Sequence, residues 1–534
     1  MGNSEDQSRV PATGRPSQLD NSNIGSLRLS LSVIGLWICL FLSAMETTIV
    51  ATALRRISDD LKSQGQSTWI VVAYLLTYNG FLLVYSKLTD IFGQKSLLLL
   101  AQFIFLVFSM ACGGAQTMTQ LIVFRALQGI GGSGIYSTVF VIITKIATVE
   151  KIGLYTGILS SVFALASLLG PILGGVIVDN TTWRWVFFIN GPGVVLSLLF
   201  VVPAIPSLGE KLFEKEKLRR VDALGGLLSL AWSTMLVFAL EEAGGSYAWG
   251  SSTIIGTLVG SGVALIAFVL YETWVQRRSR QEPMLPIRLL KSPTLSLNLI
   301  TMFAMGGCFY AAIILLPQRF QSVNGLSAAR AGIDMLAFTL VSPAFSMLCG
   351  FLLSKIPKIA TLLLIFGSAL TLVGLGLLSS LSTAESIAPA TYGYEVILAL
   401  GLGFMMPPLI FLLKVEYDDA DLAVAIGANN TARTLGGCVG LAVCSTVLHA
   451  DLGRFLRAFL NPSQIAAVLS ASASISELSK SEASRVRQAY GESYGTQFRV
   501  LIAFAGLSFI GSLGLGIMWR RRGLQVRTVQ EETS

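Results

Sequence analysis

Two opposite charges stand inside long apolar stretches in the first quarter of the chain. Glu46 interrupts the run FLSAMETTIVATAL (Phe41–Leu54), and Arg125 interrupts LIVFRALQGIGGSGIY (Leu121–Tyr136). A charge at the centre of an apolar span costs about 2.5–3.5 kcal/mol on insertion scales, so such residues face a partner or a water-filled cavity. Because few other charges lie well inside the neighbouring apolar stretches, we expect Glu46 and Arg125 to form an ion pair.

A buried carboxylate beside a guanidinium has two uses. Burial disfavours its charged form and the guanidinium favours it, so the group can take up or release a proton when its surroundings change. Glu46 is therefore a candidate proton carrier, with Arg125 as its partner. The alternative is a structural pair that only specifies how two helices pack.

A short polar turn, YSKLTDIFGQKS, separates two apolar stretches and contains Ser86, Asp90, Gly93 and Lys95. Asp90 could accept hydrogen bonds from the N-terminus of a neighbouring helix, whose dipole favours a negative charge. A clamp of this kind can hold two helix bundles together in one conformation. The simpler alternative is an ordinary polar turn.

A glycine-rich pattern, LLGPILGGVIVD, contains Gly170, Pro171, Gly174 and Gly175. Small residues four apart let helix backbones approach closely, and an internal proline removes one helical hydrogen bond. Helix packing alone would account for this pattern.

Other kinds of chemistry find no support in the sequence. The six cysteines show no CxxC or metal-ligand spacing, and the single histidine, His449, cannot build a zinc or catalytic site alone. No Gly-x-x-x-x-Gly-Lys-Ser/Thr loop for a nucleotide phosphate is present. We therefore expect no metal, no cofactor and no enzymatic activity.

The composition indicates a membrane protein. Of the 534 residues, 53% are hydrophobic and only 13% are charged, whereas soluble domains carry about 25% charged residues. The net charge of +8 comes from basic residues scattered between apolar segments, which argues against binding to nucleic acid.

Crossing the hydrocarbon core takes about 20 predominantly apolar residues in a helix. Fourteen segments meet this requirement: Leu29–Leu54, Thr68–Leu88, Leu97–Ala115, Leu121–Ile143, Gly153–Val178, Trp185–Ile205, Ala223–Leu240, Ile254–Val275, Thr294–Leu316, Gly332–Leu353, Ile359–Leu381, Tyr392–Leu413, Ala423–Leu448 and Val500–Trp519.

Lys and Arg are concentrated in the connections that share a side with both termini, which predicts that both termini are cytoplasmic. Arg55 and Arg56, just beyond the first span, run against this trend. We divide the chain into a disordered tail (1–28), a first six-helix bundle (29–205), a connection with two inserted spans (206–293), a second six-helix bundle (294–519) with a long extracellular loop (450–499), and a cytoplasmic tail (520–534).

Together, the motifs resemble those of the major facilitator superfamily. The turn Ser86–Lys95 is similar to the signature between its second and third helices, with Ser86 where glycine is usual. Arg125, Gln128 and Gly129 resemble its fourth-helix motif, and the Gly170–Gly175 pattern resembles the fifth-helix motif of its antiporters. METTIVATAL resembles the first-helix motif of the fourteen-helix drug:proton antiporters, with Glu46 in place of aspartate, and WRWVFFINGP is similar to segments of fungal toxin and multidrug efflux pumps.

The resemblance implies an all-α polytopic membrane protein with the major facilitator fold, arranged as 6 + 2 + 6 helices. It also implies a monomer in the cell membrane that exports a small, mostly apolar molecule in exchange for protons. Proton-coupled transport of a siderophore or basic amino acid, at the vacuolar membrane, is the alternative. A non-transporting membrane sensor is a third possibility, but no long cytoplasmic signalling domain favours it. Candidate substrate-binding residues are polar or soft side chains within the spans: Asn79, Gln128, Met305, Tyr310, Met405 and Asn430.

Overall fold

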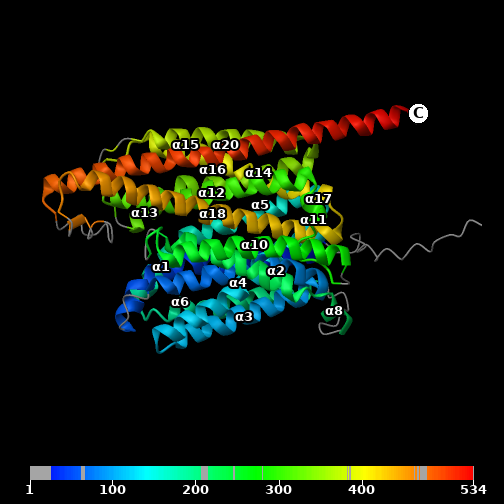
Figure 1. The fold of residues 1–534 in the computed structure, drawn as a ribbon, viewed down its shortest axis with the longest axis horizontal. Coiled ribbons are helices and arrows are strands. Elements are labelled where there is room, and N and C mark those ends of the chain that lie inside the picture. Colours follow the sequence, from blue (N-terminus) through cyan, green and yellow to red (C-terminus); the bar gives the residue numbers. More distant parts are fainter. Residues whose placement is uncertain are drawn as a thin grey trace, which may run out of the picture.

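The structure is a computed structural model that describes residues 26–61, 67–205, 215–243, 247–278, 281–326, 328–381, 383, 386–461, 464–465, 468 and 478–532. Long helices run side by side through it (Figure 1). The expected disordered tail lies outside the described residues except for 26–28, which are the start of the first helix.

The first bundle is built from six membrane-length segments, the last of which is preceded by a short helical turn. Its helices are α1 (Ser26–Asp60), α2 (Ser67–Phe92), α3 (Gln94–Gly114), α4 (Met118–Ile146), α5 (Val149–Asn180), α6 (Trp185–Phe188) and α7 (Asn190–Ala204).

Two inserted spans connect the bundles, flanked by short helices: α8 (Lys215–Arg220), α9 (Ala223–Glu242), α10 (Ser252–Arg278) and α11 (Ile287–Leu290). The second bundle comprises α12 (Pro293–Ser322), α13 (Ala328–Asp334), α14 (Leu336–Lys355), the 3₁₀ turn η3 (Pro357–Ile359), α15 (Ala360–Ser379), α16 (Ala390–Gly403), α17 (Met406–Glu416), α18 (Asp419–Leu456) and α20 (Lys480–Glu532).

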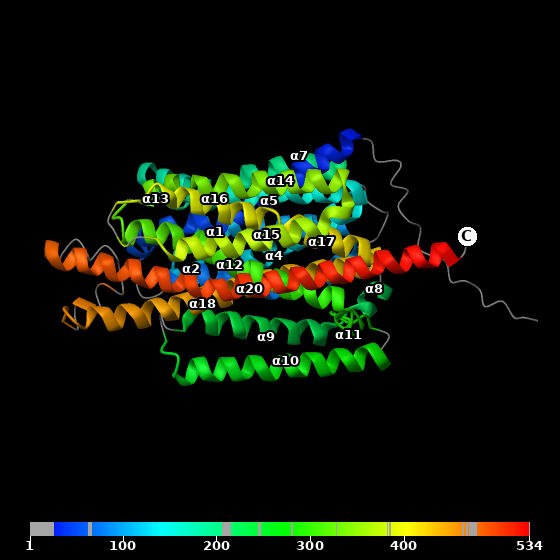
Figure 2. The same ribbon diagram turned by 90° about the horizontal axis from the view of Figure 1, so that it is seen from above.

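The described residues contain fourteen helical segments long and apolar enough to cross a membrane, which confirms the predicted number of spans. Their outer faces fit a lipid environment. On α10, large apolar side chains such as Val263, Ile266 and Leu270 are more than 60% exposed, which would be unfavourable in water. Figure 2 shows α10 at the edge of the molecule, with α9 between it and the bundles.

Two predicted segments differ from what the structure shows. The predicted loop 450–499 begins and ends in helix, because α18 continues to Leu456 and α20 already begins at Lys480. Polar residues suit a helix wherever it projects beyond the apolar core, so a polar sequence did not mark the end of either helix. The predicted tail 520–534 likewise continues α20 as far as Glu532.

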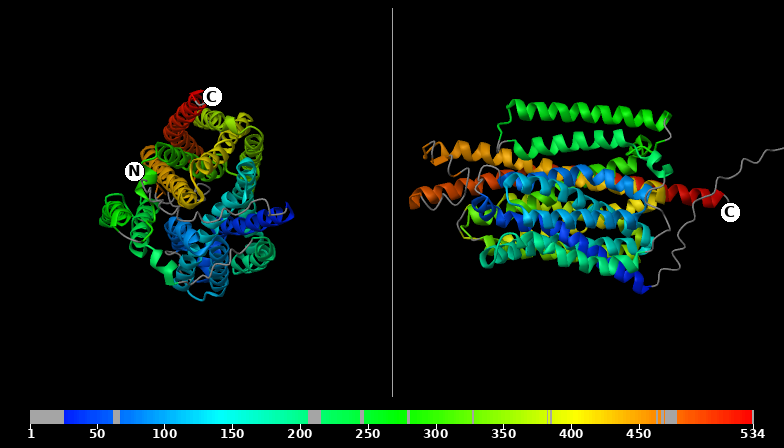
Figure 3. Two further views of the ribbon diagram at one scale, coloured as in Figure 1. Left: turned by 90° about the vertical axis from the view of Figure 1, so that its right-hand side faces the viewer. Right: turned by 90° about the horizontal axis from the view of Figure 1, so that it is seen from below.

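The two bundles face each other across α2, α5, α14 and α18 (Figure 3, left). The most extensive contact between them is α5 against α14, and α2 against α18 is the other main contact. The inserted α9 packs on both α2 and α18. We call the end of the molecule that carries Gly93, between α2 and α3, the turn end. The opposite end, which carries Ala115–Thr117, is the far end.

At the turn end the bundles are tightly closed. A Cβ atom placed on Gly350 of α14 would overlap the carbonyl oxygen of Gly153 on α5, and one placed on Gly157 would lie 2.8 Å from the Cα of Met347. Glycine is thus needed here because backbone lies directly against backbone. A hydrogen bond reinforces the contact between α2 and α18, where Ser86 Oγ donates to the carbonyl oxygen of Ala423 at 2.6 Å.

Candidate functional site

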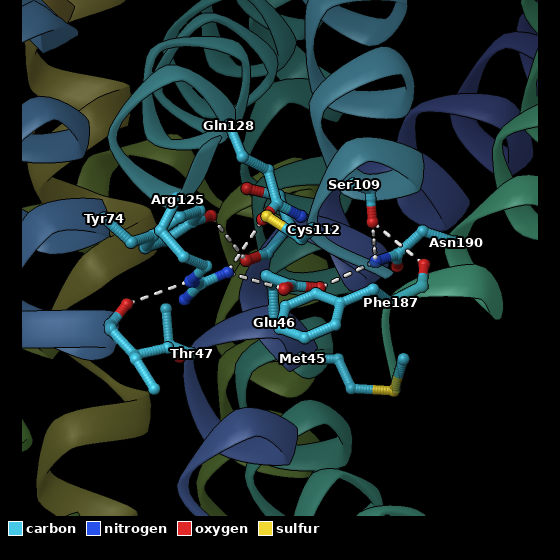
Figure 4. Close-up of polar contacts among 12 residues, drawn as sticks. Met45, Glu46, Thr47, Tyr74, Ser109, Cys112, Arg125, Gln128, Phe187 and Asn190 are labelled. Carbon is cyan, nitrogen blue, oxygen red and sulfur yellow. Dashed lines mark hydrogen bonds and ion pairs between the residues drawn. The ribbon is translucent and has the colours of Figure 1, made fainter. Parts of the chain in front are cut away.

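Glu46 and Arg125 form a fully buried ion pair inside the first bundle (Figure 4). Glu46 comes from α1 and Arg125 from α4, and Arg125 Nη1 lies 2.6 Å from Glu46 Oε1. Both side chains are 0% exposed. Arg125 lies near the far end of α4, seven residues after Met118, where the helix begins. The pairing predicted from the apolar context of the two charges is therefore present.

Two amides complete the network around the pair. Asn190, the first residue of α7, donates from Nδ2 to Glu46 Oε2 at 2.7 Å and to Ser109 Oγ at 2.9 Å. Gln128 lies one turn after Arg125 on α4 and accepts a hydrogen bond from Arg125 Nη1 at 2.8 Å. Each oxygen of the Glu46 carboxylate thus has its own donor. Gln128, a candidate for substrate binding, instead lies in this network.

The guanidinium of Arg125 is also covered by aromatic and backbone groups. Its Nε donates to the carbonyl oxygen of Ile70 at 2.9 Å. Its central carbon lies 4.3 Å from the ring centre of Tyr74 and 5.8 Å from that of Phe187. A charge excluded from water in this way gains from cation–π contact as well as from its ion pair. In the described structure neither Arg125 Nη2 nor Gln128 Nε2 has a hydrogen-bond partner, so the network retains unused donors.

The residues of the polar turn make contacts both within the first bundle and across to the second. Asp90 Oδ1 pairs with Lys145 Nζ at 3.0 Å, at the end of α4. Lys95 Nζ donates to the carbonyl oxygens of Val202 and Ile205 at 2.6 and 2.8 Å, where α7 ends. The expected contact of Asp90 with a helix N-terminus is thus replaced by a lysine partner from its own bundle, which offers a full positive charge.

Ser86 is the turn residue that bridges the two bundles, through its hydrogen bond to Ala423. A Cβ atom on Gly427, one turn further along α18, would overlap Ser86 Oγ. Gly427 therefore makes the room that a glycine at position 86 would otherwise provide. Gly93 has φ = 91°, a left-handed conformation that favours glycine.

The glycine-rich pattern of α5 packs on α1. Cβ atoms on Gly170 and Gly174 would overlap Thr48 Oγ1 and Thr52 Oγ1 respectively, whereas one on Gly175 would meet nothing within 4 Å. Pro171 is exposed and lies within the continuous helix α5. Two of the four motif residues therefore set the distance between α1 and α5, close to Glu46.

The remaining substrate candidates divide into two groups. Asn79, Tyr310 and Asn430 lie near the interface of the bundles: Asn79 Nδ2 lies 4.0 Å from Cys438 Sγ on α18, and Asn430 Oδ1 accepts from Tyr136 Oη at 3.4 Å. Met305 is buried in α12. Met405 lies inside the second bundle, where its sulfur accepts from Thr371 Oγ1 at 3.6 Å.

A break in the twelfth span explains the position of Met405. Phe404 and Met405 separate α16 from α17, and the next residue, Met406, touches the first bundle through Ser160 Oγ at 3.3 Å. Pro407 and Pro408, in the first turn of α17, are a sequence signal for this break that the prediction of one continuous span overlooked. The direction of each methionine could not be read from periodicity, because apolar residues surround all of them.

Sequence reasoning missed Arg433, a fully buried arginine of α18 that contacts aromatic residues of both bundles. The rule that identified Arg125, a charge within an apolar span, applies equally to Arg433 in Ala423–Leu448 and would have found it. Asn190 gave no such signal, because its side chain carries no charge.

Comparison with known proteins now identifies the family. The sequence pattern of the Major Facilitator Superfamily matches residues 36–441, more than half of the chain. The chain belongs to the major facilitator superfamily. The chain is confirmed as an all-α polytopic membrane protein with the major facilitator fold, and it is a multi-pass membrane transporter.

The similar proteins include efflux pumps. The chain is 45% identical to the MFS-type transporter FPY5 of Fusarium mangiferae over 495 residues, which cover 90% of this chain and 83% of that protein. It is 30% identical to the rubrofusarin-specific efflux pump aurT of Gibberella zeae over 437 residues, covering 81% and 79%. A solved structure of the proton:xylose symporter XylE matches with a TM-score of 0.57 at 13% identity, covering 90% of this chain and 95% of that one. This last likeness concerns the fold alone.

Proposed function

We propose that this transporter exports a small, mostly apolar molecule, such as a fungal toxin, secondary metabolite or drug, from the cytosol in exchange for protons. It would act as a monomer in the cell membrane, with both termini cytoplasmic and the proton gradient as its only energy source. The observation that carries the proposal is the ion pair of Glu46 and Arg125, a titratable group sealed inside the bundle of a protein whose relatives include efflux pumps.

In the proposed mechanism, Glu46 is charged and paired with Arg125 in the conformation described here. Protonation removes the negative charge, weakens the hydrogen bonds from Arg125 and Asn190, and leaves the pair free to separate. Since the side chains are excluded from water, proton exchange requires a rearrangement that opens the site. Coupling therefore follows from the burial itself: the proton is taken up in one conformation and released in another.

A direct mechanical route leads from this pair to the bundle interface. Glu46 lies two residues from Thr48 on α1, and Thr48 Oγ1 donates to the carbonyl oxygen of Ala166 on α5 at 3.0 Å. Close packing at Gly170 and Gly174 means that α5 must follow a shift of α1. In turn, α5 packs on α14 at the turn end. With the turn end cytoplasmic, the conformation described here is closed to the cytosol.

The test follows loss of a compound from living cells. Drug-sensitive yeast with and without the protein are preloaded with a panel of small fluorescent aromatic compounds, and efflux is recorded before and after a protonophore is added. We expect protein-dependent efflux of at least one compound, abolished by the protonophore. Protein-dependent efflux that persists after collapse of the gradient would contradict proton coupling, and uptake stimulated by external acid would contradict export.

A further inference from the structure

Arg433 occupies an aromatic cage between the two bundles. Its central carbon lies 4.8 Å from the ring centre of Phe163, 5.4 Å from those of Tyr136 and Tyr310, and 5.9 Å from that of Phe309. Tyr136 and Phe163 belong to α4 and α5 of the first bundle, and Phe309 and Tyr310 belong to α12 of the second. The cage therefore changes shape whenever the bundles move relative to each other.

Within the described part of the chain, Arg433 has no acidic partner. No carboxylate lies within the 4.0 Å of an ion pair, and its polar contacts go from Nη2 to the hydroxyl oxygens of Tyr136 and Tyr310. Arg125, by contrast, has the carboxylate of Glu46 as its counter-charge. A charge excluded from water without a counter-charge is strongly unfavourable, so the position of Arg433 calls for a negative group that arrives with a ligand.

Unused hydrogen-bonding capacity lies around the cage. Arg433 Nε, Asn430 Nδ2 and Asn79 Oδ1 are buried and have no hydrogen-bond partner in the described structure. Arg433 is only 1% exposed, whereas Phe163, Phe309 and Tyr310 are each partly exposed. Three rings of the cage thus retain some accessible surface, whereas Arg433 retains almost none.

The cage also lies between the bundles, away from the ends of the helices that carry Arg433 and Tyr310. Arg433 is 14 residues after the start of α18 at Asp419, and Tyr310 is 17 residues after the start of α12 at Pro293. Since α12 has 30 residues and α18 has 38, both positions fall in the middle third of their helices. Transporters of this architecture place their substrate site at the midplane, between the two repeats.

We propose that Arg433 binds the anionic oxygen group of an aromatic substrate, a carboxylate or an acidic phenol, while the rings of the cage stack on its aromatic body. The planar fork of a guanidinium matches a carboxylate in two parallel hydrogen bonds. Nε is without a partner, and Nη2 would exchange one tyrosine hydroxyl for the carboxylate. The proposal rests on the proposed export function and narrows its substrate class. Organic cations are excluded from this class because Arg433 would repel them.

The experiment measures binding rather than transport, so it can succeed even if proton coupling fails. Isothermal titration calorimetry on the purified full-length protein in detergent at pH 7.5 compares benzoate, 1-naphthoate, 9-anthracenecarboxylate and 1-pyrenecarboxylate with their primary amides. Each amide matches its acid in shape but carries no charge. We expect at least one acid to bind about tenfold or more tightly than its amide.

Arg433→Gln should remove the preference for that acid while leaving the amide bound as before. Arg499→Gln serves as the matched control and should keep the preference, since Arg499 is an exposed arginine of α20 outside the cage. Arg433→Lys, which keeps the charge but loses the fork, should reduce the preference and tests the proposal if Arg433→Gln does not fold. Equal binding of every acid and its amide, or an unchanged preference in either Arg433 variant, would overturn the proposal.

Discussion

Each oxygen of the Glu46 carboxylate has a separate hydrogen-bond donor. This arrangement determines how far a substitution at the pair lowers the free energy of unfolding. Arg125 Nη1 donates to Oε1 and Asn190 Nδ2 donates to Oε2, with every atom out of reach of water. Removing one member of a buried pair leaves the other charged and alone, which costs about 3–5 kcal/mol. Replacing both members with apolar groups removes that penalty.

We therefore expect Glu46→Ala to destabilise the protein by about 3–5 kcal/mol, and the double variant Glu46→Ala/Arg125→Leu to recover most of this loss. The midpoint temperature for loss of the monodisperse protein in detergent, followed by size-exclusion chromatography after heating, measures both. A double variant as unstable as the single one would show that an unpaired Arg125 is not the cause.

At the scale of elements, closure of the turn end depends on α5 and α14 meeting backbone to backbone. An added methyl group at Gly350 meets the carbonyl of Gly153, which cannot turn away as a flexible side chain could. Overpacking of this kind costs about 1–3 kcal/mol. The cost falls only on the conformation in which the turn end is closed, so the equilibrium should shift toward opening.

Gly350→Ala should thus increase the share of molecules open at the turn end by roughly 5- to 150-fold relative to closed ones. Spin labels on Lys151→Cys and Lys355→Cys, two exposed positions at this end, would report it as a longer interlabel distance. Gly376→Ala is the control, because a Cβ atom there meets nothing within 4 Å. Identical distance distributions for the two alanine variants would contradict this account of closure.

An ion-pair network connects the inserted helices to α2 at the turn end. Glu282, in the connection after α10, pairs with Lys87 at 2.7 Å and with Arg220 at 2.6 Å. Partial burial of Glu282 opposes its ionisation, but Lys87 and Arg220 outweigh this effect and hold its pKa below the usual value. A carboxylate whose pKa is lowered by folding stabilises the folded state at pH values above its pKa in the unfolded state, about 4.3 for Glu. This stability is lost as pH falls through the pKa of the folded state.

Glu282→Gln should accordingly lower the midpoint temperature of thermal denaturation by a constant amount between pH 7 and about pH 5, and by less as pH falls below about 4. Exposed Glu492 provides a control, since Glu492→Gln should change stability little at any of these pH values. A difference between wild type and Glu282→Gln that grew on acidification would have the wrong sign.

At the scale of the whole molecule, the transporter contains two sites of opposite electrostatic character. The pair of Glu46 and Arg125 is electrically complete and sealed within one bundle, whereas Arg433 lies between the bundles without an acidic partner in the described structure. The helices α1 and α5 connect them: α1 carries Glu46, and α5 carries Phe163 of the cage and the glycines that meet α14. A change of charge at Glu46 can therefore alter the space around the substrate.

The sequence predicted those features that hydrophobicity controls. Apolar length gave the spans, and the cost of a buried charge gave the pairing of Glu46 with Arg125. Features set by tertiary packing were not predictable: the lysine partner of Asp90 lies 55 residues away on another helix, and Asn190 reaches Glu46 across 144 residues. Gly427 is a further example: it makes room for Ser86, which lies next to it only when the two bundles are packed together.

Proton coupling through Glu46 is the central claim, and gradient-driven transport by Glu46→Gln tests it most directly. Glutamine keeps the shape and one acceptor for Arg125 but cannot titrate. In inverted membrane vesicles with an imposed acid interior, wild-type protein should accumulate substrate, and the variant should lose about tenfold or more of this uptake. The variant should still exchange labelled for unlabelled substrate without a gradient. Normal gradient-driven uptake by Glu46→Gln would contradict the claim.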